Sequence, residues 1–126
     1  MNNVERTRAF FDAWERMDID ALVDAADDNI FYHNIPMEPV TGKQAFREGL
    51  TPFIGMSEKI IWDTLHIAES SDGVVLTERV DHFHLAGGIK ISVRVMGTFE
   101  FNSNGKLIKW RDYFDLGEFQ SQMPDN

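Results

Sequence analysis

The sequence predicts an α+β domain in which helices come first and a long, curved antiparallel sheet follows. Apolar residues recur every three or four positions up to residue 26, which is the spacing of amphipathic helices. From residue 30 the period changes to two, as in strands. Short turns rich in Gly, Ser and Asn then divide residues 59–115 into four strand-like segments, and connections this short join antiparallel neighbours.

Two amphipathic helices are predicted at the start of the chain. Asn2 or Asn3 can cap the first helix, and Asp18 can cap the second, shorter one. The polar run Asp-Asp-Asn at residues 27–29 ends the second helix. The apolar positions of the first helix, which we assign to the core, are Val4, Phe10, Phe11, Trp14 and Met17.

One strand and a third helix are predicted next. Residues 30–35 alternate and stop before a proline, as expected for a strand that ends there. Thr41 and Gln44 have the spacing of a capping box, which predicts the start of a helix. Pro52 and Gly55 are expected to bring that helix to an end.

The remaining strands are predicted to be long. They are expected at Lys59–Glu69, Gly73–Leu85, Ile89–Phe101 and Lys106–Asp115. Strands of this length can bend around a helix, and Gly97 marks a position for such a bend or a bulge. We expect the final segment, residues 117–126, to form one turn near Phe119 and then to fray.

Length, charge and cysteine content exclude several classes of protein. A chain of 126 residues has the size of a single domain, which we expect to span residues 1–126. Its net charge of −9, without any basic run, argues against nucleic acid and anionic membranes as partners. With no cysteine, the chain has no disulfide and no thiolate nucleophile. Because no apolar stretch suits a signal peptide or a membrane span, we expect a cytoplasmic protein.

Three of the predicted strands carry polar or amphipathic side chains two residues apart, so that both members of each pair leave the same face of the sheet. A packed apolar core does not require such residues. We therefore predict that they line one pocket on the inner face. The six residues are Tyr32, Asn34, Arg79, Asp81, Trp110 and Asp112.

Two of these six groups are carboxylates and one is a guanidinium. An isolated buried charge is strongly destabilising, so buried charges are normally paired or used in function. Asp81, Asp112 and Arg79 together carry −1, and the cluster becomes neutral if one carboxyl keeps its proton. We predict one protonated and one ionised Asp near neutral pH, with pKa values that belong to the coupled set. Such a pair suits concerted acid and base catalysis.

The neighbouring polar groups extend this cluster into a site for water. The ionised Asp, the hydroxyl of Tyr32 and the amide of Asn34 offer three contacts that can hold and deprotonate one water molecule. The protonated Asp can donate its proton to an oxygen on the opposite side. Water attack together with protonation of the leaving oxygen, on an uncharged substrate, is the chemistry of epoxide ring opening.

These residues occur in four separated segments, YHNIP at 32–36, TERVD at 77–81, VMG at 95–97 and WRDYFDL at 110–116. In this order the segments resemble the limonene-1,2-epoxide hydrolase family, within the nuclear-transport-factor-2-like (NTF2-like), or SnoaL-like, superfamily. The resemblance extends over nearly the whole chain. It implies a cone-shaped fold of the NTF2-like or cystatin-like class, a homodimer, no metal and no other cofactor. It also implies a hydrophobic epoxide as substrate and no covalent intermediate.

The resemblance assigns a role to each residue of the predicted site. Asp81 matches the acid that protonates the epoxide, and Asp112 matches the base that activates water. Arg79 matches the residue that bridges them, while Tyr32 and Asn34 match the other ligands of the water. The substrate-binding positions implied by the same resemblance are Trp110, Phe83, Val93, Val95 and Phe114.

Other interpretations of the same residues stay open at this point. Arg79 with two Asp residues also suits a purely structural ion network. The pocket could serve a non-catalytic domain that binds an apolar small molecule, or an isomerase or cyclase on the same fold. A central arginine disfavours a ketosteroid-isomerase-like site, which uses a lone carboxylate base. His82 and His84 lie two residues apart, but no third ligand at a recognisable spacing makes them a metal site.

Overall fold

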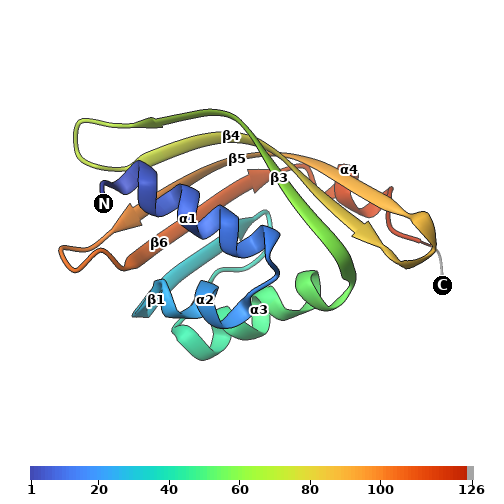
Figure 1. Cartoon of the computed structure of the whole chain (residues 1–126), viewed down its shortest axis with the longest axis horizontal. Coiled ribbons are helices and arrows are strands. Elements are labelled where there is room, and N and C mark those ends of the chain that lie inside the picture. Colours follow the sequence, from blue (N-terminus) through green and yellow to red (C-terminus); the bar gives the residue numbers. More distant parts are fainter. Residues whose placement is uncertain (125–126) are drawn as a thin grey trace.

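The structure is a computed structural model that describes residues 1–124, with helices at both ends of the chain and one six-stranded sheet (Figure 1). The helices are α1 (Asn3–Glu15), α2 (Ile19–Asp24), α3 (Lys43–Gly55) and α4 (Leu116–Gln120). The strands are β1 (Ala26–Ile35), β2 (Val40–Thr41), β3 (Ser57–Glu69), β4 (Val75–Leu85), β5 (Lys90–Phe101) and β6 (Leu107–Phe114). The predicted α+β class is confirmed.

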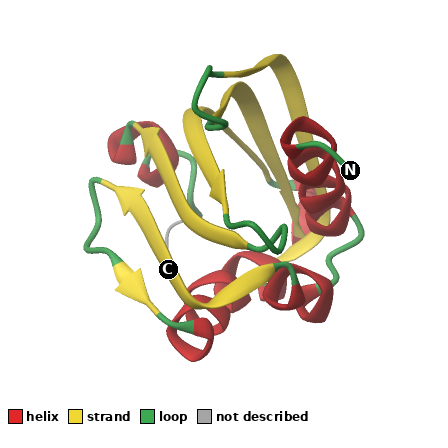
Figure 2. Cartoon of the chain, turned by 90° about the vertical axis from the view of Figure 1, so that its left-hand side faces the viewer, coloured by secondary structure: helices red, strands yellow, loops and turns green. Residues whose placement is uncertain are grey.

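The six strands form one curved sheet in the order β2-β1-β6-β5-β4-β3, and Figure 2 shows that this sheet does not close into a barrel. As predicted, β3, β4, β5 and β6 pair with one another in antiparallel fashion. The first strand departs from the predicted antiparallel sheet, because β1 pairs with β6 in parallel. This pairing is possible because residues 36–106 separate the two strands and let the chain return to the same end of the sheet.

The first two helices begin where the sequence predicts. The side chain of Asn2 accepts a hydrogen bond from the backbone of Glu5, whose carboxylate accepts one from the backbone of Asn2. Asp18 caps α2 by accepting from the backbone N–H of Ala21. These caps fix the start of both helices, and α1 lies along the inner face of the curved sheet (Figure 1).

The third helix begins differently from the prediction. Thr41 belongs to β2, where it pairs with Phe31, and the residue before the helix is Gly42, which makes no side-chain cap. The predicted capping box is therefore wrong, because strand pairing occupies Thr41. The helix continues through Pro52 and ends at Gly55, the second of the two residues predicted to end it. The carbonyl that loses its partner to this proline belongs to Glu48, an exposed residue that water can reach.

Two strand features also differ from the prediction. Strand β1 begins at Ala26 and not at residue 30, with a register shift before Phe31. The pairing of β5 stays regular at Gly97, so no bulge forms at this position. At the other end of the chain, α4 supplies the turn predicted near Phe119. The predicted fraying falls partly on residues 125–126, outside the described residues.

Aromatic residues of α1 pack against the sheet and form most of the core on this side. Trp14 stacks on Trp62 of β3 with ring centroids 4.7 Å apart, and Phe10 meets Trp110 of β6 edge-on at 5.2 Å. The predicted core positions Phe10, Phe11 and Trp14 are buried, whereas Val4 and Met17 are half-buried against the core. Within residues 1–124, no helix is long and apolar enough to cross a membrane.

Candidate active site

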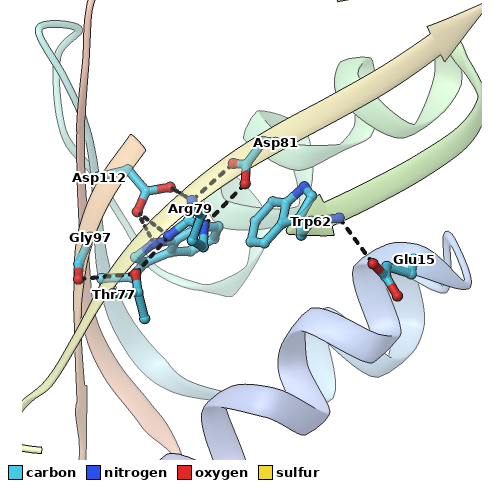
Figure 3. A network of polar contacts seen from close by, with 8 residues as sticks. Glu15, Trp62, Thr77, Arg79, Asp81, Gly97 and Asp112 are labelled. Carbon is cyan, nitrogen blue, oxygen red and sulfur yellow. Dashed lines mark hydrogen bonds and ion pairs between the residues drawn. The ribbon is translucent and has the colours of Figure 1, made fainter. Parts of the chain in front are cut away.

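Polar side chains of β4 and β6 meet on the inner face of the sheet. Thr77, Arg79 and Asp81 alternate along β4 with outward-facing residues, and Asp112 reaches them from β6 across the intervening β5. Only 1% of Arg79, 4% of Asp81 and 5% of Asp112 is exposed. Figure 3 shows the guanidinium between the two carboxylates. The alternation of side chains along the strands predicts that these groups converge, and the structure brings them together.

Every N–H group of Arg79 donates a hydrogen bond within this cluster. Asp81 accepts from Nε and Nη2 at 3.1 and 2.9 Å, and Asp112 accepts from Nη1 and Nη2 at 3.1 and 2.8 Å. The fifth donor, on Nη1, bonds the hydroxyl of Thr77 at 3.1 Å. The guanidinium is saturated by its own protein, so it has no donor left for a ligand.

Aromatic rings surround the guanidinium on its apolar sides. Its Cζ lies 4.5 Å from the ring centroid of Trp62, 5.2 Å from that of Phe11 and 5.8 Å from that of Phe99. These distances are within the range of cation–π attraction. The rings also exclude water, which strengthens the electrostatic coupling between Arg79 and its two carboxylates.

Gly97 makes room for the carboxylate of Asp112. A Cβ at this position would lie 2.1 Å from Oδ1 of Asp112 and 2.8 Å from Nη1 of Arg79. Real Cβ atoms essentially never approach other atoms this closely. The residue that the sequence suggested as a bend or bulge is therefore a point of close approach between a strand and a buried ion cluster.

The parallel pairing of β1 and β6 brings the predicted water ligands to the cluster. Tyr32 lies in register with Trp110, and Asn34 lies in register with Asp112. The rings of Tyr32 and Trp110 stack at 4.6 Å, and the indole N–H of Trp110 donates to Oδ1 of Asp112 at 2.8 Å. Trp110 was predicted as a pocket neighbour, and the structure adds that it holds the Asp112 carboxylate.

Two polar groups beside Asp112 form no hydrogen bond with the rest of the described chain. Within residues 1–124, neither the hydroxyl of Tyr32 nor the side-chain amide of Asn34 forms a hydrogen bond, although both residues line the same cavity. Tyr32 is 7% exposed. Because no protein group bonds them within these residues, the hydroxyl of Tyr32 and the amide of Asn34 are available to a water molecule or a ligand.

Burial perturbs the acid–base behaviour of the site. Loss of solvation raises the pKa of Asp81 to about 6, although the positive charge of Arg79 opposes this shift. Burial, and after it the charge of Asp112, also raises the pKa of Tyr32, so its hydroxyl keeps the proton it can donate. Burial alone would lower the pKa of Arg79, but the two carboxylates outweigh it and raise that pKa. A carboxyl with the pKa of Asp81 can act as an acid close to neutral pH.

A cavity of about 40 Å³ opens beside the two carboxylates. Of the ten residues predicted for the site, eight line it, and Arg79 lies behind the carboxylates. Val93 is buried on β5 but does not reach the cavity wall. The lining residues are Trp14, Tyr32, Asn34, Phe53, Trp62, Asp81, Phe83, Val95, Trp110, Asp112, Phe114 and Phe119.

Four lining residues were not predicted as part of the site. Trp14 was assigned to the core. Trp62 lies two residues after Ile60 on β3 and is buried with it, so the alternation along this strand could have placed Trp62 on the inner face. Phe53 and Phe119 lie on α3 and α4. No local pattern marks these two residues, because their position depends on how the helices pack on the sheet.

The histidines on the outer face of β4 have other contacts. His82 lies between Oγ of Ser92 at 2.7 Å and a carboxylate oxygen of Asp63 at 3.0 Å. His84 forms no side-chain hydrogen bond within residues 1–124. Over the same residues, no three His, Cys, Asp or Glu side chains lie in an arrangement that could hold a metal ion.

Comparison with known proteins gives one family match for nearly the whole chain. The family model described as the limonene-1,2-epoxide hydrolase catalytic domain matches residues 1–125. Among solved structures, a limonene-epoxide-hydrolase-like epoxide hydrolase from M. tuberculosis is 26% identical to this chain, with a TM-score of 0.79. That similarity covers 95% of this chain and 87% of the M. tuberculosis chain.

Two more distant structures share the fold. SalBIII, described as an epoxide hydrolase/cyclase-like enzyme in pyran ring formation in salinomycin, is 16% identical over 92% of each chain, with a TM-score of 0.83. A protein assigned as a SnoaL-like polyketide cyclase from Shewanella denitrificans is 14% identical over 95% of each chain, with a TM-score of 0.83. The NTF2-like, SnoaL-like fold that the sequence resemblance implied is confirmed.

Proposed function

The chain belongs to the limonene-1,2-epoxide hydrolase family, and on this premise we propose that it adds water in one step to a small or medium hydrophobic epoxide and releases a vicinal diol. The observation that carries the proposal is the buried Asp81–Arg79–Asp112 network next to two unbonded polar groups. The single domain, the homodimer and the independence from cofactors remain predictions.

In the proposed reaction, Asp112, Tyr32 and Asn34 hold one water molecule. Asp112 removes a proton from this water as its oxygen attacks an epoxide carbon. The bond between that carbon and the ring oxygen breaks, and Asp81 donates its proton to that oxygen. Each proton transfer contributes on the order of 10²–10⁴ to the rate. A proton returning from Asp112 to Asp81, directly or through solvent, completes the cycle.

The charge of the cluster stays constant through this reaction. Before the reaction Asp81 is neutral, Asp112 is negative and Arg79 is positive, which gives zero. Afterwards the proton has moved to Asp112 and the negative charge to Asp81, which again gives zero. Because isolated charges are strongly disfavoured in a dry interior, a reaction without net charge change suits this site.

The hydrogen bonds support the proposed division of roles. Three N–H groups donate to Asp112, two from Arg79 and one from Trp110, whereas two donate to Asp81. Donors of this kind stabilise a carboxylate in its anionic form. The carboxyl with fewer donors is also the one whose pKa burial raises to about 6, and we assign it the acid role.

A cyclase would use the same two carboxyl groups. In that reaction a hydroxyl group of the substrate replaces the water, and the carbon chain of the substrate holds this hydroxyl group in place. The free groups of Tyr32 and Asn34 favour hydrolysis, because they are two further ligands that a water molecule needs. A structural ion network, the other alternative, has no use for unbonded polar groups beside it.

Isotope labelling tests the proposal. A set of small hydrophobic epoxides is incubated with excess protein in ¹⁸O-water for a single turnover. We expect label in the diol and none in the carboxyl groups of Asp81 or Asp112. Label in the protein would contradict the one-step mechanism, and a cyclic ether without label would indicate cyclisation.

Matched variants separate catalysis from stability. Asp81→Asn and Asp112→Asn each leave a neutral pair with Arg79, so we expect the fold to survive while hydrolysis falls by about 10² or more. Asp12→Asn, at an exposed position of α1, is the control and should keep full activity. Unchanged turnover in either site variant would contradict the proposed roles.

A further inference from the structure

The cavity lies between two separate groups of aromatic rings. One, the floor group, consists of Trp14, Tyr32, Trp62 and Trp110. The other, the mouth group, consists of Phe53, Phe83 and Phe119. With Phe114, aromatic residues make up eight of the twelve side chains that line the cavity. A wall of this composition offers mainly ring faces and ring edges to whatever fills the cavity.

Rings pack within each group but not between the groups. In the floor group the Tyr32 and Trp110 rings stack at 4.6 Å, and Trp14 stacks on Trp62 at 4.7 Å. In the mouth group Phe53 lies 5.7 Å from Phe83 and 6.0 Å from Phe119. Within residues 1–124, no ring of one group stacks on a ring of the other. A ligand in the cavity would therefore supply the missing contact between them.

The polar part of the wall lies at the carboxylates and carries no positive charge. Besides the rings and Val95, the cavity is lined by Asn34, Asp81 and Asp112. Arg79 lies behind them, and all its N–H groups are already bonded. An anionic ligand would meet two carboxylates without a free cation, so the cavity favours an uncharged ligand.

The cavity is too small for such a ligand as it stands. A cavity of roughly 150 Å³ holds benzene, whereas the volume here is about 40 Å³. Part of the wall must move to admit a substrate. Phe53 and Phe119 are half-buried residues on α3 and α4, whereas Trp14, Trp62 and Trp110 are buried within the core. Phe53 and Phe119 are therefore the residues of the mouth group that can move with least disturbance of packing.

The attachment of α4 supports this assignment. The helix has five residues, and Glu118 ties it to Arg94 of β5 through an ion pair in which the Arg94 side chain is 80% exposed. The side chain of Gln122 adds hydrogen bonds to the backbone of Ser92 at 2.9 and 2.8 Å. The Arg94–Glu118 pair is a surface contact that can break and reform without opening the core.

We propose that the substrate is an uncharged epoxide that carries a flat aryl ring, and that Phe53 and Phe119 select it by contacting that ring. This inference rests on the proposed function for the epoxide, and on the two aromatic groups for the ring. A flat ring can fill the space between the groups and stack on both. A puckered saturated ring of the same carbon count is thicker and lacks the charge distribution of an aromatic face.

Binding of two diols tests the proposal without any turnover. The probes are 1-phenyl-1,2-ethanediol and 1-cyclohexyl-1,2-ethanediol, the products that hydrolysis of the matching epoxides would give. Isothermal titration calorimetry on the intact protein should show tighter binding of the phenyl compound, by about three- to tenfold. Because the cyclohexyl compound is the more hydrophobic, simple apolar burial predicts the opposite order. Equal binding, tighter binding of the cyclohexyl diol or no binding of either would overturn the proposal.

Two variants test the residues that we assign to selection. In Phe53→Leu and Phe119→Leu the side chain stays apolar but loses its ring, so the preference for the phenyl diol should shrink by at least twofold. Phe101→Leu makes the same change on β5 away from the cavity, and it should keep the full preference. Unchanged preference in both mouth variants, with melting temperatures close to that of the parent, would remove Phe53 and Phe119 from selection.

The two proposals fail in different experiments. If no epoxide is hydrolysed but the phenyl diol still binds more tightly, the proposed hydrolase activity is wrong. The preference for an aryl ring is then retained as a binding property of the cavity. If epoxides are hydrolysed but phenyl and cyclohexyl diols bind alike, the hydrolase stands and the aryl preference is wrong.

Discussion

Two arginines of neighbouring strands, Arg79 of β4 and Arg94 of β5, show how burial changes the use of one residue type. Both pair with carboxylates at similar distances, 2.8 and 2.9 Å for Arg79 and 3.1 Å for Arg94. The Arg79 side chain is fully buried, whereas that of Arg94 is 80% exposed. Water can replace the partner of Arg94, and nothing on the inner face can replace the partners of Arg79. An arginine–carboxylate pair therefore forms a fixed site on the buried face of the sheet and a weakly held contact on the exposed face.

Strand alternation causes this difference. Arg79 and Arg94 lie on adjacent strands, where Arg79 pairs with Val95 and Arg94 pairs with Val80, so their side chains leave opposite faces of the sheet. Charged residues in a sequence are thus informative about function only once it is known from which face of the sheet their side chains leave.

The largest effect is expected for Arg79→Met. This change leaves two carboxylates without a counter-charge in a dry interior, and breaking a buried pair in this way typically costs about 3–5 kcal/mol. Denaturant unfolding would measure the loss. The triple variant Arg79→Met, Asp81→Asn, Asp112→Asn should recover much of it, because no buried charge is left. A triple variant as unstable as the single one would show that charge is not the cause.

The second effect concerns pH and belongs to the inner cluster alone. Because the pKa of Asp81 is raised to about 6, kcat/KM should fall about tenfold per pH unit above pH 6 as the acid loses its proton. A raised pKa also means that the folded state binds this proton more tightly than the unfolded state. The contribution of Asp81 to the free energy of unfolding is therefore fully present below about pH 4. It is lost as the pH rises through 6.

Asp81→Asn provides the control for the stability part of this prediction. Its unfolding free energy should lack the decline between pH 4 and 6 that the parent protein shows, since the titrating carboxyl is absent. Parallel pH dependence in both proteins would assign the decline to another group.

The third effect is steric. Gly97→Ala would place a Cβ 2.1 Å from Oδ1 of Asp112, so the carboxylate or the strand must shift. We expect a loss of about 1–3 kcal/mol in stability, as for other overpacked sites, together with a lower kcat. Gly55→Ala is the matched control, because a Cβ there meets nothing within 4 Å. Equal behaviour of the two variants would show that the close approach at Gly97 is not limiting.

The smallest effect is expected for Arg94→Gln. It removes one exposed ion pair from α4, and water compensates for most of the loss. We expect a melting temperature indistinguishable from that of the parent, both at low and at high salt. A large shift would mean that the outer arginine, like the inner one, supports the fold, and the contrast between them would fail.

Strand parity made much of the site predictable from the sequence. The alternation around Arg79, Asp81 and Asp112 is local, so it fixes the face from which each side chain leaves before any partner is known. It could not show that β1 joins β6 in parallel, because that pairing depends on elements more than 70 residues apart. For the same reason the positions of Phe53 and Phe119 were missed.

Two other errors have local causes. Thr41 and Gln44 have the spacing of a capping box, but Thr41 pairs with β1 as part of β2 and does not cap α3. Gly97 was noticed, but glycine in a strand has several uses, and the choice between a bulge and a close approach depends on the neighbouring strands. Val93 was placed on the correct face, but it is buried in the core and does not line the cavity.

The complete use of the Arg79 donors has a practical consequence for engineering. Because the guanidinium and both carboxylates are held by the protein itself, their arrangement does not rely on contacts with the bound molecule. Phe53 and Phe119, which make no hydrogen bond to the polar centre, can then be changed to accept a new substrate scaffold while that centre is left untouched. Libraries directed at α3 and α4 would explore substrate range with little risk to the chemical step.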